Sequence, residues 1–213
     1  MGHNAAKNPI TIKMLTSNKI EVRLAAIRAI GRKHTDNAYC IQTLVDTLTS
    51  ETQPEIKAAI CITLAESKTT QPSVVLALSE ALGDDSPLVR EHAISALINF
   101  VEMASPAIGN LLYCLKDSSP QVRANAAWLL GKLNNPATII TESLCDCLND
   151  AEALVRWRAA NALKQLDAIS IRIVLSLENA LLDPNHMVAK AAKDAFISIQ
   201  ERNSCQVPTS LVA

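Results

Sequence analysis

A single motif recurs six times along this 213-residue chain in nearly constant register. Its closest copies occupy residues 84–97, 117–130 and 150–163, and weaker copies begin at residues 17, 51 and 183. Each close copy begins with aspartate and continues as DSPLVREHAISAL, SSPQVRANAAWLL or AEALVRWRAANAL. An anchoring apolar residue stands in every copy, and successive anchors are 34, 33, 33, 33 and 33 residues apart. The anchors are Val22, Ile56, Val89, Val122, Val155 and Val188. An internal repeat of this period predicts an array of short supersecondary units.

The second half of each copy is typical of an amphipathic helix that starts at a Ser-Pro pair. Serine accepts a hydrogen bond at a helix N-terminus, and proline suits the first helical position. Ser86 and Ser119, each followed by proline, therefore predict two helix starts. After the anchor, apolar residues recur at offsets 0, 4, 7 and 8, as in Val122, Ala126, Leu129 and Leu130. This spacing lies on one face of a helix with a 3.6-residue period.

Another apolar stripe precedes each anchor and predicts a first helix in every unit. An example is AIGNLLYCL at 107–115. These first helices are expected to end seven residues before the anchors, at Leu82, Leu115, Leu148 and Leu181. No helix pair can bury both stripes alone, so the units must stack against one another.

The sequence therefore predicts an all-α fold, a right-handed α-α superhelix of about six two-helix repeats of 33 residues. We expect a single solenoid over residues 1–200. A short capping repeat, with NPITIKML as its leading helix, would begin it, and a capping repeat at about 168–200 would end it. Residues 201–213 are expected to form a disordered tail.

Composition and charge exclude several classes of protein. The hydrophobic fraction is 49% and the aromatic fraction 3%, which favours helices packed through small side chains. The net charge of −1, from 20 basic and 21 acidic residues, lacks the surplus that non-specific nucleic-acid binding requires. No apolar run approaches the roughly 20 residues that span a membrane, and no secretory signal precedes the repeats. We expect a cytoplasmic protein whose six cysteines are reduced.

Charged residues also occupy fixed places in the repeat. Acids stand five residues before the anchors, at Glu51, Asp84, Asp117, Asp150 and Asp183. Bases stand one residue after them, at Arg23, Lys57, Arg90, Arg123 and Arg156. We predict a ladder of charge-assisted hydrogen bonds between neighbouring units, with a charge row that binds a ligand as the alternative.

The repeated pattern DxSPxVRxxAAxAL resembles the short HEAT-like repeats of the phycobilisome-lyase type, over roughly residues 9–200. The motifs of tetratricopeptide and ankyrin repeats are absent from the sequence. The resemblance implies a HEAT-like solenoid, and its members include scaffolds, assembly factors and proteins that attach or detach bilins. The His-Glu pairs of HEAT-like deoxyhypusine hydroxylases are missing, and the balanced charge disfavours a HEAT-like DNA glycosylase.

The two tryptophans fall outside the apolar stripes of adjacent units. Trp128 is at offset 6 and Trp157 is at offset 2, so both should project from second helices, which line the concave wall in HEAT-like stacks. Polar residues at nearby offsets would extend this strip, namely His92, Asn125, Arg158, Asn161 and Lys132. The strip predicts a binding patch, with an ordinary solvated face as the alternative.

No complete catalytic or metal-binding constellation accompanies the strip. His92 has no acid, nucleophile or second histidine to help it, and Cys145 and Cys147 would point to different faces of a helix. We therefore predict a non-catalytic scaffold or assembly factor with no cofactor, whose concave face binds another protein. The alternative is a bilin lyase subunit or phycobilisome-processing factor. A second HEAT-like chain or a phycobiliprotein would then be the partner, and bilin propionates would pair with Arg158 or Lys132.

Overall fold

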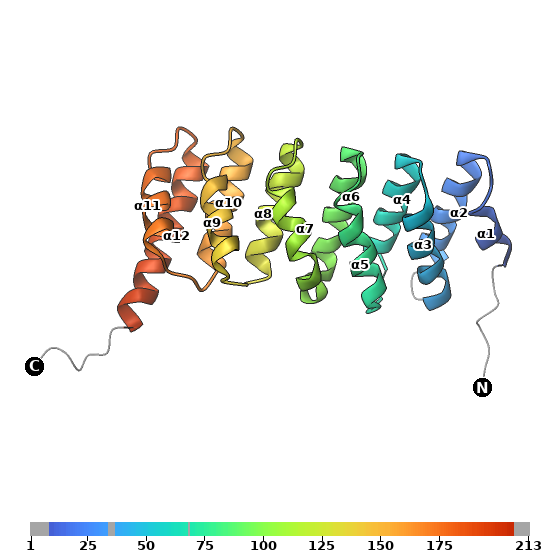
Figure 1. The fold of residues 1–213 in the computed structure, drawn as a ribbon, viewed down its shortest axis with the longest axis horizontal. Coiled ribbons are helices and arrows are strands. Elements are labelled where there is room, and N and C mark those ends of the chain that lie inside the picture. Colours follow the sequence, from blue (N-terminus) through green and yellow to red (C-terminus); the bar gives the residue numbers. More distant parts are fainter. Residues whose placement is uncertain (1–8, 34–36, 68, 207–213) are drawn as a thin grey trace, which may run out of the picture. The chain divides into compact units, whose positions relative to one another are not determined.

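Helices account for all the regular structure in the described part of the chain. The structure is a computed structural model that describes residues 9–33, 37–67 and 69–206. These residues form twelve α-helices and two 3-10 helices without a β-strand (Figure 1). The chain divides into two compact units, Met1–Asn110 and Leu111–Ala213. The expectation of a single solenoid over 1–200 stays a prediction.

Unit 1 contains three successive pairs of helices. They are α1 (Pro9–Met14) with α2 (Ile20–Lys33), α3 (Ala38–Ser50) with α4 (Pro54–Ala65), and α5 (Pro72–Ala81) with α6 (Pro87–Leu97). The expected short leading helix is α1. Two 3-10 helices follow, η1 (Ile98–Met103) and η2 (Ser105–Ala107), and the boundary between the units then falls inside α7 (Ile108–Cys114).

Unit 2 continues the same pairing. After the end of α7 come α8 (Pro120–Lys132), α9 (Thr138–Cys147) with α10 (Ala153–Gln165), and α11 (Ile171–Ala180) with α12 (His186–Gln206). The Ser-Pro signal and the ends of the first helices are confirmed. Ser119 caps α8 by accepting a hydrogen bond from the Val122 N–H, and α9 and α11 end one residue before Leu148 and Leu181.

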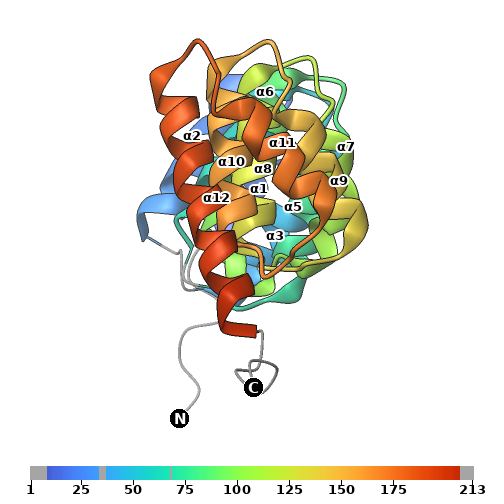
Figure 2. The same cartoon turned by 90° about the vertical axis from the view of Figure 1, so that its left-hand side faces the viewer.

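The helices of each unit form two layers, with first helices in one layer and second helices in the other. In unit 2, α10 packs against both α8 and α12, while α9 packs against α11 (Figure 2). The anchoring Val122, Val155 and Val188 are fully buried between the layers. Stacking therefore covers the apolar face that each pair would otherwise expose to water.

The second helices α8 and α10 approach each other closely because their contact is made by the smallest side chains. A Cβ added to Gly131 on α8 would lie 2.6 Å from the Cα atom of Ala162 on α10 and 2.7 Å from its Cβ atom. Atoms that close overlap, so glycine at this position permits the helix packing.

The end of the chain differs from the sequence prediction. The helix α12 continues through Gln206, into the segment expected to be a disordered tail. No glycine or proline interrupts the sequence between Asn185 and Val207, so nothing in that stretch stops the helix. Arg202 also holds the end of α12 in place, because its Nη1 group donates a hydrogen bond to the Leu166 carbonyl oxygen at 2.7 Å. Residues 207–213 lie outside the described part.

Ion pairs between consecutive repeats confirm the predicted ladder within each unit. The N–O distances are 2.6–3.0 Å in Arg23–Glu51, Lys57–Asp84, Arg123–Asp150 and Arg156–Asp183. In the remaining pair of the series, Arg90 belongs to unit 1 and Asp117 belongs to unit 2.

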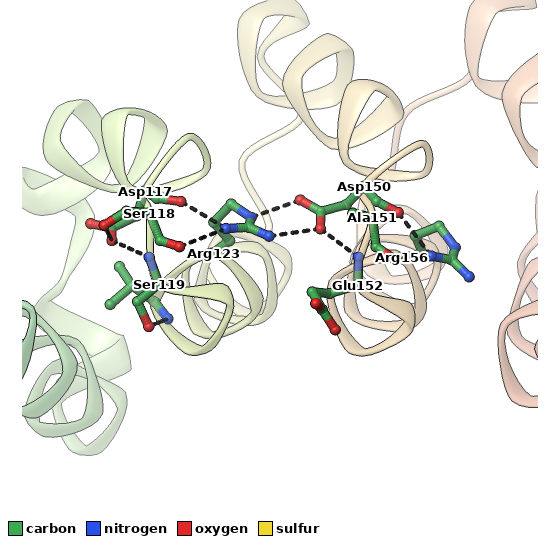
Figure 3. A network of polar contacts seen from close by, with 9 residues as sticks. Asp117, Ser118, Ser119, Arg123, Asp150, Ala151, Glu152 and Arg156 are labelled. Carbon is green, nitrogen blue, oxygen red and sulfur yellow. Dashed lines mark hydrogen bonds and ion pairs between the residues drawn. The ribbon is translucent and has the colours of Figure 1, made fainter.

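Each arginine of the ladder in unit 2 joins two repeats. The Nε and Nη2 groups of Arg123 donate to the two carboxylate oxygens of Asp150 at 2.7 and 2.9 Å. Its Nη1 group donates to the carbonyl oxygen of Asp117, in the loop before its own helix (Figure 3). Asp150 in turn accepts from the Glu152 N–H at 2.9 Å, which orders the loop before α10. Bidentate pairing of this kind sets the register between neighbouring repeats.

The ladder lowers the pKa of Asp84, Asp150 and Asp183. Burial acts to raise the pKa of Asp150, but hydrogen bonds from Arg123 and from the Glu152 backbone outweigh it. For Asp183 the hydrogen bond from Arg156 is the main cause of the lowered pKa. The ionised carboxylates therefore stabilise the folded state at neutral pH, and this contribution is lost as the pH falls below their ordinary pKa and through the lowered one.

None of the helices in the described ranges is long and apolar enough to cross a membrane.

We expect Gly131→Ala to lower the free energy of unfolding by about 1–3 kcal/mol, because α8 and α10 must move apart. Urea unfolding followed by circular dichroism measures this. Gly109→Ala is the matched control, because a Cβ there meets nothing within 4 Å. It should leave the stability unchanged or raise it by up to about 1 kcal/mol. Equal stability of the two variants would contradict the close packing.

We expect Asp150→Asn to lower the free energy of unfolding at neutral pH by about 1–3 kcal/mol, through loss of charged hydrogen bonds. The wild type should lose stability as the pH falls below about 4, and the variant should lose less over that range because one lowered pKa is gone. Urea titrations at several pH values measure both effects. Asp146→Asn, at an exposed ion pair with Arg172, should change little. An equal pH dependence of Asp150→Asn and wild type would refute this assignment.

Candidate functional site

Both tryptophans of the chain lie in the second-helix layer of unit 2. Trp128 is in the last half of α8, and Trp157 is in the first half of α10. Both side chains are half-buried, as their positions outside the apolar stripe suggest. The sequence predicts that the two indoles lie in one region of this layer. One side chain, that of Arg158, lies near both rings.

The guanidinium of Arg158 lies near both indole rings. Its central carbon is 5.8 Å from the centroid of the Trp128 ring and 5.1 Å from that of the Trp157 ring. The Nζ atom of Lys132 lies 5.5 Å from the Trp128 centroid. Cations within about 6 Å of an aromatic centroid are attracted by the negative face of the ring. We call these four residues, Trp128, Lys132, Trp157 and Arg158, the cation–tryptophan cluster.

Arg158 lacks the polar partners that other arginines of unit 2 have. Its Nε atom is buried and has no hydrogen-bond partner. No carboxylate within the described ranges forms an ion pair with it, whereas Arg156, two residues earlier, holds Asp183 at 2.6 Å. Burial lowers the pKa of the Arg158 guanidinium, although an arginine stays charged at neutral pH. The cluster therefore contains a partly desolvated cation with unused donors.

Asn125 lies in a different environment from the one expected. It is only 8% exposed, and its Oδ1 atom accepts a hydrogen bond from Gln121 at 3.1 Å. The reason is its offset of 3 from the anchor. At about 100° per residue, this offset lies on the flank of the helix, about 90° from the centre of the apolar stripe. The prediction that Asn125 lies on an accessible wall is therefore wrong. The same flank position buries the Nε atom of Arg158.

Asn161 and His92 complete the set predicted from the sequence. Asn161 is half-buried on α10, and its Nδ2 group donates to the Trp157 carbonyl oxygen at 2.8 Å, which leaves its Oδ1 atom for other partners. His92 is half-buried on α6 in unit 1. Its place beside the cluster stays a prediction.

The sequence interpretation predicted Lys132 and Arg158 in the same strip as the indoles, but it did not predict that the two cations lie over the rings. Lys132 follows Trp128 by four residues, the spacing at which side chains on a helix meet, so one signal was present. The approach of Arg158 to Trp128 has no local signal, because it depends on how α10 packs against α8.

The described cysteines lie in the core. Cys40, Cys61, Cys114, Cys145 and Cys147 are all buried. Burial raises the pKa of Cys61 and Cys147 to about 12. Within residues 9–33, 37–67 and 69–206, no group of three His, Cys, Asp or Glu side chains is arranged to hold a metal ion. His3 and His34 are outside these ranges.

Comparison with known families identifies the repeat. The family model of HEAT repeats matches residues 8–98 and 108–197. The chain therefore belongs to the HEAT repeat family. A search of curated proteins found no matching sequence.

Several solved structures share the fold at low identity. A designed armadillo repeat protein in complex with the peptide (KR)4 is 19% identical, with a TM-score of 0.69 over 91% of this chain and 100% of that one. Computationally designed armadillo repeat proteins for modular peptide recognition are 19% identical, with a TM-score of 0.63 over 88% and 98%. An engineered protein is 21% identical, with a TM-score of 0.68 over 90% and 95%. These likenesses support the α-α superhelical repeat fold.

We expect the buried thiols to resist modification, because the thiolate is the reactive form and burial disfavours it. In the native protein at mildly alkaline pH, Ellman's reagent should react promptly with Cys205 at most, whose side chain lies outside the described part. All six cysteines should react in denaturant. Prompt reaction of Cys61 or Cys147 in the native protein would contradict their place in the core.

Proposed function

We propose that this HEAT repeat protein is a non-catalytic, cytoplasmic scaffold that binds another protein through the second-helix layer of unit 2. The observation that carries the proposal is the cation–tryptophan cluster. Tryptophan and arginine are the side chains that most often dominate the binding energy of protein interfaces. Here two tryptophans and an arginine without a polar partner gather on two adjacent helices.

The packing around the cluster supports a surface prepared for binding. The contact of Gly131 with Ala162 holds α8 against α10, and the Arg123–Asp150 pair fixes the register of the same two repeats. A rigid site loses little conformational entropy when a partner binds. The half-buried indoles also have fewer rotamers to lose than fully exposed side chains would have.

Similar solved structures add support at the level of the fold. The designed armadillo repeat protein that shares this fold is in complex with a peptide. Repeat solenoids offer extended binding surfaces because each unit adds area beside the last. A protein segment laid across the second helices of unit 2 is consistent with that use.

A bilin lyase subunit of the phycobilisome-lyase type is a second candidate, with a phycobiliprotein or a second HEAT-like chain as partner. The unpaired guanidinium of Arg158 favours it, because bilin propionates would pair with such a cation. Direct stacking of a tetrapyrrole on Trp128 would require Lys132 and Arg158 to move from its ring. A coloured covalent adduct, formed on mixing the protein with a bilin and a phycobiliprotein, is the result that would select this candidate.

We expect Trp128→Ala combined with Trp157→Ala to weaken partner binding by at least about thirtyfold, the loss typical of interface hot spots. Partners are recovered from lysate of the native host by affinity capture with quantitative mass spectrometry. The purified partner is then titrated by calorimetry, and circular dichroism confirms that each variant is folded.

Tyr113→Ala combined with Ile171→Ala is the matched control. These side chains are 82% and 80% exposed on first helices of the same unit. This control should retain binding. Because Trp128 is half-buried, Trp157→Ala alone is tested as well, and it should also weaken binding. Unchanged affinity in folded tryptophan variants would refute the proposed surface.

A further inference from the structure

Resting on the proposed binding role, we infer that the cation–tryptophan cluster takes an acidic protein segment, in which an aspartate or glutamate side chain pairs with the Arg158 guanidinium. Three features of the molecule support this pairing: the missing partner of Arg158, the positions of the two cations over the indoles, and the charge in this part of the layer.

The missing partner is unusual within unit 2. Arg123 and Arg156 bind carboxylates in the ladder. Arg172 pairs with Asp146, and Arg202 donates to the carbonyl oxygen of Leu166. Arg158 is the one arginine described in this unit without a hydrogen bond or an ion pair. Leaving charged donors unsatisfied after partial burial costs free energy, so a carboxylate supplied by a partner would recover it.

The geometry of the cluster allows a carboxylate of a partner to pair with Arg158. Arg158 is half-buried rather than buried, and with Nε enclosed the terminal Nη groups are the donors left for a partner. Contact with an aromatic ring does not use the N–H groups of a guanidinium, which match the two oxygens of a carboxylate. The rings of Trp128 and Trp157 would cover apolar parts of the same segment.

Charge selects the sign of the partner. Lys132 and Arg158 both lie beside the Trp128 ring, so a basic segment would meet like charges there. This is the reverse of the designed armadillo repeat protein, whose bound peptide, (KR)4, is basic. On the next helix of the layer, α12, Lys190 and Lys193 are exposed. Its exposed acids are Asp194 and Glu201, and neither forms an ion pair with Arg158.

The test is selection from a random peptide library displayed on phage. The full chain is the bait, beside Arg158→Gln and Arg172→Gln. Arg172→Gln removes the same charge from the first-helix layer of the same unit, where the side chain is 47% exposed. The selected peptides are then made in two forms, as selected and with every acidic residue replaced by its amide.

Binding is followed by the intrinsic emission of the protein. Both tryptophans of the chain belong to the cluster, so a change in emission reports on this site. Peptides without tryptophan are used for these titrations. Binding to the protein with both Trp128→Ala and Trp157→Ala, which has no tryptophan left, is measured by calorimetry. Circular dichroism is recorded for each variant.

We expect peptides enriched in aspartate and glutamate over the input library. Their affinity should fall about tenfold to a hundredfold in Arg158→Gln, which is the loss expected for a charge-assisted hydrogen-bonded pair. The amide forms should lose a similar factor, rising salt should weaken binding, and Arg172→Gln should bind as the wild type does.

Three outcomes would overturn the inference: no acidic enrichment, no peptide recovered, or selected peptides that bind Arg158→Gln unchanged. The last is separable from failure of the proposed function. Peptides whose affinity is unchanged by Arg158→Gln but lost with Trp128→Ala and Trp157→Ala would support the binding surface and refute only its preference for acidic segments. Peptides whose affinity is unchanged by all three substitutions would refute both the surface and the preference.

Discussion

Each pair of helices in this chain has apolar stripes that it cannot cover by itself, and the fold follows from that constraint. The anchoring valines of unit 2 are fully buried only because another repeat lies against them. Small residues let the second helices approach closely, as Gly131 and Ala162 do. The interior is therefore shared between repeats, and the stability of one repeat depends on its neighbours.

The ladder fixes the register in which neighbouring repeats pack. Apolar contacts alone tolerate sliding of one repeat along another, whereas a bidentate arginine–carboxylate pair is satisfied in a single register. Arg123 meets Asp150 and, one repeat later, Arg156 meets Asp183 with almost the same geometry. Because the same loop acids accept backbone N–H groups before the second helices, the pairs also order the turns that connect the layers.

Two arginines on α10 lie in contrasting environments. Arg156 follows the anchor by one residue, faces the loop of the next repeat and has a carboxylate there. Arg158 follows it by three residues, lies on the flank toward Trp128 and has none. The repeated position builds the fold. The position occupied by Arg158 differs between repeats and lies beside tryptophans that occur in only two of them, and we propose that a partner binds there.

The sequence by itself determined the repeat, the helix pairs, most helix ends and the acid–base ladder. All of these depend on local periodicity or on positions that return every 33 residues, so one chain contains several copies of the same signal. It also placed Trp128 and Trp157 outside the apolar stripe by helical angle alone. The tertiary structure decided what helical periodicity does not contain: how deeply Asn125 is buried on its flank, that Arg202 holds the end of α12 against Leu166, and that Arg158 of one helix reaches the ring of Trp128 on another. Those features depend on the distance and rotation between packed helices, which small contacts such as Gly131 against Ala162 set and which helical periodicity does not encode.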